Sequence, residues 1–171
     1  MAAKKFLTIV AGVKTLMSAL TTSSGAGDEG NLVALNTSGK IDETMMPAGI
    51  GADTCVANAS ENLAAGDMVN LWDDAGTLKV RKADATAAGK ECDGFVSGAV
   101  TSGDPATVIL DGTLAGLTGL TIGAHYYLGT TAGAIVTTAP SATNNVYQGV
   151  GKAKSATELV FERGEPITIA A

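Results

Sequence analysis

MVNLWDDAGTLKVRK, at residues 68–82, is the most strongly patterned stretch of the sequence. Apolar side chains recur at every second position, at Val69 and Leu71 before the turn sequence DDAG, and at Leu78 and Val80 after it. Alternation with a period of two is typical of a half-buried strand, and aspartate and glycine are typical turn residues. The stretch therefore predicts a β-hairpin.

The same arrangement recurs toward the C-terminus. Three further strand pairs are predicted: Gly94–Val100 with Ala106–Asp111, His125–Leu128 with Ala134–Thr138, and Asn145–Ala153 with Glu158–Glu162. A short edge strand, Pro166–Ile169, follows them. Many short strands separated by turns, with no convincing helix between them, predict a compact antiparallel β-barrel or β-sandwich.

The N-terminal segment has a different pattern. Apolar residues separated by steps of three and four form a stripe made of Phe6, Ile9, Val13, Leu16 and Leu20. This spacing favours an amphipathic helix, although the β-branched residues of Phe6–Val10 leave a strand open. A helix of about 15 residues is only marginally stable alone in water. The segment would therefore need a surface to pack on, either a partner or its own β-domain.

Residues 35–47, LNTSGKIDETMMP, connect the two regions. A glycine turn at Gly39 and a stop at Pro47 are typical of a linking segment. We therefore expect a mainly β protein with an N-terminal extended or helical arm at residues 1–47, serving anchoring and oligomerisation. The β-barrel or β-sandwich domain would span residues 48–171.

Composition limits what such a protein can do. Apolar residues make up 46% of the chain but aromatics only 4%, and there are 22 glycines, so the core is built mainly from small side chains. Burial contributes roughly 25 cal/mol per Å², which makes a thin core weakly stabilising and favours oligomerisation. The formal charge of −6, with no basic cluster larger than Lys79, Arg81 and Lys82, argues against nucleic acid as a partner.

Residues that could carry chemistry are few and scattered. His125 is the single histidine and has no nucleophile motif beside it. Asp73 and Asp74 lack the spacing of a calcium loop. Cys55 and Cys92 are not a CxxC pair, and reduced thiols are favoured over a disulfide. We expect no enzyme activity, no cofactor and no metal site.

The aromatic residues allow two interpretations. Trp72, Tyr126, Tyr127 and Tyr147 could form a carbohydrate-stacking patch. Because large side chains are so rare in this chain, use as core or interface anchors is favoured.

Three short segments early in the chain match a known pattern: Val33-Ala34-Leu35-Asn36, Gly39-Lys40-Ile41-Asp42 and Met45-Met46-Pro47. They resemble a connector near the N-terminus of tailed-bacteriophage virion proteins, especially head decoration proteins and fibres. Four downstream segments resemble the β-domain of phage capsid decoration (cementing) proteins: Ala65–Asn70, Gly76–Ala83, Gly119–Leu128 and Ser155–Leu159.

The resemblance implies a structural virion protein that decorates and stabilises the outer capsid surface by bridging major capsid protein subunits. Its implied partners are the major capsid protein and further copies of itself, as a homotrimer or alternatively a dimer, with no nucleic acid and no membrane. It would assemble in the host bacterial cytoplasm and end on the outer surface of the virion. The alternative is a fibre or host-adhesion protein with a receptor-binding β-domain.

The predicted contact residues all lie in the arm. Apolar contact with the capsid or with other subunits is expected from Phe6, Ile9, Val13, Leu16, Leu20, Leu35 and Ile41. Lys40 and Asp42 are expected to pair with charges on the capsid or on a neighbouring subunit.

Overall fold

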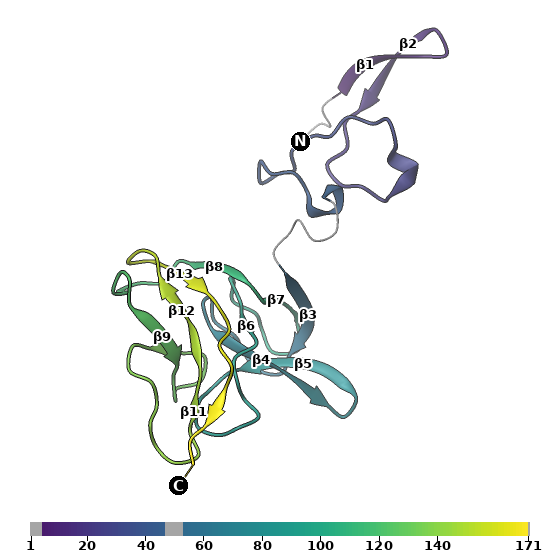
Figure 1. The fold of residues 1–171 in the computed structure, drawn as a ribbon. Helices are drawn as coiled ribbons and strands as arrows, with labels where there is room; N and C mark the ends of the chain where they lie inside the picture. Colours follow the sequence, from purple (N-terminus) through teal and green to yellow (C-terminus); the bar gives the residue numbers. More distant parts are fainter. Residues whose placement is uncertain (1–4, 47–52, 171) are drawn as a thin grey trace. The chain divides into compact units, whose positions relative to one another are not determined.

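The structure, a computed structural model, describes residues 5–46 and 53–170 (Figure 1). The chain divides into two units, Met1–Gly51 and Ala52–Ala171. Strands dominate both, and helix is confined, in the parts described, to two short 3-10 turns, η1 (Ala26–Asp28) and η2 (Glu43–Met45). The prediction of a mainly β protein is confirmed.

The N-terminal unit begins with a hairpin of β1 (Lys5–Val10) and β2 (Val13–Ser18), which pair antiparallel along their whole length. The predicted helix over residues 6–20 is therefore wrong, and the strand alternative is what forms. Both strands are rich in β-branched residues, which favour extended backbone. Between them, Ala11 and Gly12 have φ values of 49° and 80°, the geometry of the two-residue turns that match strand twist.

The second unit contains a closed barrel with the strand order β3-β5-β4-β6-β7. Its strands are β3 (Thr54–Ala59), β4 (Met68–Asp74), β5 (Thr77–Lys82), β6 (Gly94–Phe95) and β7 (Pro105–Ile109). The hairpin predicted at residues 68–82 is confirmed as β4 and β5. The expectation of a wholly antiparallel barrel needs a correction, because β3 pairs with β5 in parallel.

A five-stranded antiparallel sheet follows, with the order β10-β9-β12-β13-β8. Its strands are β8 (Gly112–Ala115), β9 (His125–Leu128), β10 (Ile135–Val136), β12 (Gly149–Ala153) and β13 (Glu158–Phe161). The predicted pairs at β9 with β10 and β12 with β13 are both present. A small separate pair joins β11 (Val146–Tyr147) to β14 (Ile167–Thr168). β14 lies within the edge strand predicted at Pro166–Ile169.

Two buried clusters hold the second unit together. One fills the barrel and includes Val69, Val96 and Val108. The other lies between the barrel and the five-stranded sheet and includes Met68 and Phe95. Successive residues of a strand point to opposite faces, so the neighbours Met68 and Val69 serve different clusters.

Aromatic packing joins the barrel to the sheet. Phe95 of β6 meets Phe161 of β13 edge to face, with ring centroids 5.3 Å apart.

The inward position predicted for Leu78 is wrong, because this side chain is exposed. It pairs with Asp73 beside the turn of the hairpin, at the end of β4 away from the buried Val69.

A buried amide also ties the two sheets together. The Gln148 side chain accepts a hydrogen bond from the Cys92 backbone N–H at 2.7 Å and donates one to the Cys92 carbonyl at 2.9 Å. It donates a second to the Gly164 carbonyl at 3.1 Å. Segments far apart in sequence are held by this one side chain.

Candidate functional site

The N-terminal unit has no core of its own among the residues described. Not one described side chain in residues 5–46 is buried. The large apolar side chains exposed there are Leu7, Ile9, Val13, Leu16, Leu32, Val33, Leu35, Ile41 and Met46. Burial of apolar surface is what offsets the entropy lost when a chain becomes ordered. This unit therefore presents a surface that needs covering.

One face of the β1–β2 hairpin carries the three most exposed of these apolar side chains. Leu7 lies directly opposite Leu16, and Ile9 lies opposite Lys14. Directly opposed residues share a face, and the three apolar side chains are 64%, 64% and 67% exposed. We call this set, Leu7, Ile9 and Leu16, the hairpin face.

The predicted stripe is not brought together as one surface. Ile9 and Leu16 share the hairpin face, but Phe6 and Val13 lie on the opposite side, where Phe6 pairs with Met17. The heptad spacing missed Leu7, because it falls off a helical stripe. A period-two interpretation of Phe6–Val10 would have found it.

A shallow groove lies beside the hairpin within the same unit. It has a volume of about 310 Å³ and is lined by Lys5, Phe6, Ala19 and residues 32–35. Leu20 holds this region together through its backbone, donating to the Leu32 carbonyl at 2.9 Å and accepting from the Ala34 N–H at 2.7 Å. The structure thus brings Phe6 and Leu35 to one groove, and uses Leu20 as the bridge to the adjoining loop.

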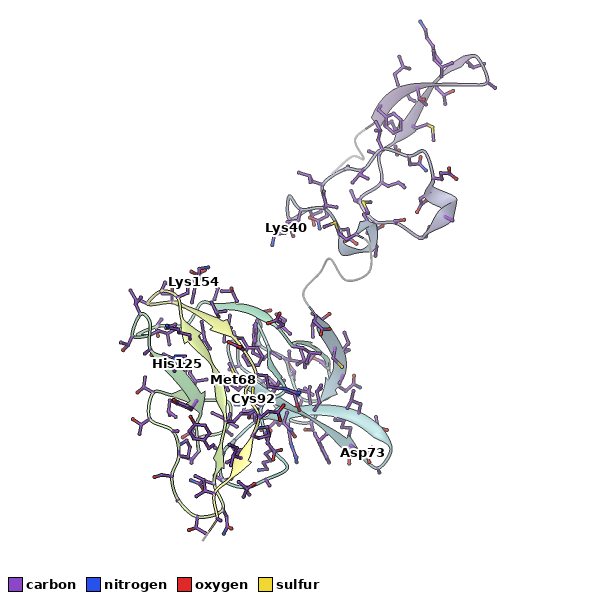
Figure 2. The ribbon with its side chains drawn as sticks, viewed as in Figure 1. Lys40, Met68, Asp73, Cys92, His125 and Lys154 are labelled. Carbon is purple, nitrogen blue, oxygen red and sulfur yellow. The ribbon has the colours of Figure 1, made fainter. Side chains whose placement is uncertain are left out.

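The two charged residues singled out in the connector, Lys40 and Asp42, have different local contacts. Lys40 and Ile41 are exposed, and Lys40 lies on a turn organised by the Asn36 side chain, which accepts from the Lys40 N–H at 3.1 Å (Figure 2). Asp42 instead accepts from the Thr44 hydroxyl at 2.7 Å and from the Thr44 N–H at 3.1 Å. These bonds lower the pKa of Asp42, the hydroxyl contributing most. Within the described residues, Asp42 organises its own loop.

A second carboxylate has the same role at η1. Asp28 accepts from the Ser24 N–H at 2.6 Å and from the Ser24 and Ser23 hydroxyls. The Ser24 N–H is the largest cause of the lowered pKa of Asp28. The two loops are connected, since the Ser23 N–H donates to the Thr44 hydroxyl at 2.9 Å.

These two carboxylates predict that the loops of the N-terminal unit open in acid. A carboxyl group whose pKa is lowered by folding stabilises the fold fully above its ordinary value of 3.8, and that stabilisation is lost as the pH falls through the lowered pKa. Amide hydrogen exchange at Ser24 and Thr44, corrected for intrinsic rates, should accelerate as the pH falls through the lowered pKa values of Asp28 and Asp42. The Ser38 and Lys40 amides are the control, because their acceptor, the Asn36 amide oxygen, does not titrate. Equal acceleration at all four amides would contradict the prediction.

The residues with reactive side chains in the second unit are dispersed. Cys92 is fully buried, and burial, followed by the Asp93 charge, raises the pKa of its thiol to about 12. Cys55 and Cys92 are both free thiols. Asp73, near the end of β4, accepts from the Gly76 N–H of the following turn at 2.8 Å, an ordinary contact beside a hairpin turn. Burial opposes ionisation of Asp84, but hydrogen bonds from Thr86 and then Lys90 outweigh it and lower the pKa of that carboxyl.

Two features are absent from the described ranges. Residues 5–46 and 53–170 contain no group of three or more histidine, cysteine or acidic side chains placed to hold a metal ion. The helices found in those same ranges are all too short to cross a lipid bilayer.

The four singled-out aromatics have separate environments. Tyr126 is buried, and its hydroxyl accepts from the Thr121 N–H at 2.9 Å. The Arg81 guanidinium lies over the Trp72 ring, with its Cζ atom 4.8 Å from the ring centroid. Tyr127 and Tyr147 lie together, with ring centroids 5.2 Å apart and an angle of 51° between the rings. The neighbouring Tyr127 phenol raises the pKa of Tyr147.

No known family model matches the sequence, and no curated protein matches it. Among solved structures, the chain is similar to the N base of head fiber gp8.5 of bacteriophage phi29, with a TM-score of 0.45 and 18% sequence identity. The similarity covers 66% of this chain and 96% of that one.

Proposed function

We propose that this protein is a structural virion protein that decorates the outer surface of a bacteriophage capsid and stabilises it by bridging major capsid protein subunits. The observation that carries the proposal is the contrast in burial between the units. Residues 53–170 contain two buried apolar clusters, whereas residues 5–46 keep all described side chains at least partly exposed. A unit that needs covering, joined to one that does not, suits an attachment segment carrying a self-sufficient domain.

The energetic case rests on the hairpin face. Full burial of a leucine or isoleucine contributes about 1.5–3 kcal/mol, so Leu7, Ile9 and Leu16 offer a substantial gain to any surface that covers them. Copies linked as a trimer would engage several such surfaces at high effective concentration. Binding to the assembled lattice in preference to free capsid subunits would then stabilise the shell by mass action.

The partner is proposed from the resemblance of residues 33–47 to the connector of phage head decoration proteins and fibres. The overall charge of −6 favours docking on a more basic surface. The homotrimer, the outer-surface location and the absence of catalysis belong to the same proposal. The buried thiol of Cys92 fits the proposed absence of catalysis, because the thiolate is the reactive form of cysteine and the raised pKa keeps this thiol protonated.

Removal of residues 1–46 tests this function. The shortened chain should stay soluble and folded, because both buried clusters lie within the second unit. It should no longer pellet with empty shells assembled from the major capsid protein of the same phage. The full-length chain is the positive control, and circular dichroism establishes folding of the shortened one. Normal co-sedimentation of the folded, shortened chain would refute the role of the N-terminal unit.

A further inference from the structure

The outer face of the five-stranded sheet carries a groove along β12. Its volume is about 270 Å³, just below the range of roughly 300–1,000 Å³ typical of small-molecule sites. Its lining includes His125, Tyr127, Gly149, Lys152, Glu162 and Gly164. His125 is the first residue of β9 (Figure 2) and lines the groove.

The groove exists because β12 lacks a side chain where its neighbour has one. Gly149 pairs with Tyr127 of β9, and Lys152 pairs with His125. The register shifts between Gly149 and Gly151, as in a β-bulge. The floor at Gly149 therefore lies open beside the tyrosine.

Two glycines of β12 differ in why they are glycine. At Gly151, φ is 139° and an added Cβ would lie 2.1 Å from the Val160 carbonyl oxygen, so the fold requires glycine. At Gly149, φ is outside the left-handed region and an added Cβ would meet no atom within 4 Å. Neither backbone nor packing demands glycine at this position, and its effect is to keep the groove open.

An aromatic side chain and a fixed edge shape the groove. Tyr127 lines it and packs against Tyr147, which limits movement of the ring. At the opposite edge, Arg163 pairs with Asp93 at 2.9 Å, and the Gly164 N–H donates to the Gly149 carbonyl at 2.9 Å. A site held in place before binding loses less entropy when it binds.

The polar groups offer both hydrogen-bond donors and acceptors. The Lys152 ammonium donates and the Glu162 carboxylate accepts, and neither belongs to an ion pair found in the described part of the chain. A phosphate or another anion would be matched by donors alone. Hydroxyl groups both donate and accept, and a sugar ring also presents an apolar face that an aromatic ring can cover.

We propose that this groove binds a short neutral saccharide, with a sugar ring against Tyr127 and hydroxyls on Lys152, Glu162 and His125. The site lies wholly within the second unit, so it goes beyond capsid decoration and does not depend on it. The interpretation of the aromatics as core or interface anchors would then hold for Tyr126 but not for Tyr127.

The test uses the full chain on an array of neutral, acidic and phosphorylated oligosaccharides, followed by titration of the best neutral one. Binding to a neutral oligosaccharide is expected, and Gly149→Leu should weaken it more than about tenfold, since the added side chain occupies the groove. Thr113→Leu, an exposed position on β8 of the same sheet, is the matched control and should bind normally. Thermal unfolding of both variants should stay unchanged.

Three results would overturn the proposal. They are no binding to any neutral sugar on the array, binding restricted to acidic or phosphorylated sugars, and undiminished binding by Gly149→Leu. If Gly149→Leu does not fold, Lys152→Met provides the same comparison, because it keeps the length of the side chain and removes its donor.

Discussion

Aspartate at both Leu7 and Leu16 is expected to abolish co-sedimentation with capsid shells. The two side chains face each other across the hairpin and are each 64% exposed, so the chain itself loses little packing. A partner surface loses about 1.5–3 kcal/mol for each leucine it no longer covers. The combined loss corresponds to roughly 10²–10⁴-fold weaker binding, before the further cost of desolvating two carboxylates.

The control places the same charges elsewhere in the same unit. Thr37 and Ser38 are exposed residues of the turn before Gly39, and aspartate at both should leave co-sedimentation intact. Analytical ultracentrifugation of both double variants measures self-association separately from capsid binding. Full decoration by the Leu7 and Leu16 variant would contradict the proposal that the hairpin face makes the contact. Equal loss in both variants would show that net charge, and not the hairpin face, controls attachment.

The largest loss of stability is expected from Gln148→Leu. Leucine has nearly the same volume but cannot replace the three hydrogen bonds to the Cys92 N–H, the Cys92 carbonyl and the Gly164 carbonyl. The buried Cys92 N–H and carbonyl are each left without a partner at a cost of about 1–3 kcal/mol, so a decrease of roughly 2–6 kcal/mol in the free energy of unfolding is expected. Urea denaturation of the full chain measures it.

Two further observations make this prediction specific. Asn58→Leu changes an exposed amide of β3 in the same way and should alter the unfolding free energy by less than about 0.5 kcal/mol. In the unsubstituted chain the Cys92 thiol is buried, with its pKa raised to about 12. In Gln148→Leu this thiol should react faster with a disulfide reagent, and the half-buried Cys55 serves as the reference. Unchanged stability and thiol reactivity would show that the amide does not hold the sheets together.

Sequence reasoning failed in the N-terminal segment for a physical reason. Phe6–Val10 is a short, nearly continuous apolar run that fits a helical spacing and also suits a strand, and periodicity alone cannot distinguish the two. The Ala11-Gly12 turn and the β-branched residues on each side decide for the hairpin. The consequence is functional, because Leu7, and not Phe6 or Val13, lies on the hairpin face that we propose for attachment.

The candidate saccharide groove had only a partial signal in the sequence. Tyr127 and Tyr147 were visible as aromatics with two interpretations, but nothing local pairs them. Gly149 reads as one glycine among 22. Its meaning appears only when the β12–β9 register sets it beside Tyr127.

Local sequence pattern was enough to predict the β class, the turns and most of the hairpins, since alternation and turn residues act between neighbours in the chain. The hairpin predicted at residues 68–82 is present for that reason, as the antiparallel pair of β4 and β5. Three features follow from long-range packing alone: the parallel pairing of β3 with β5, the hydrogen bonds of Gln148 to Cys92, and the grouping of Gly149 with Tyr127 and Glu162 around one groove. These depend on which distant segments pack together, and that choice is made by burial summed over the whole unit, which no short stretch encodes.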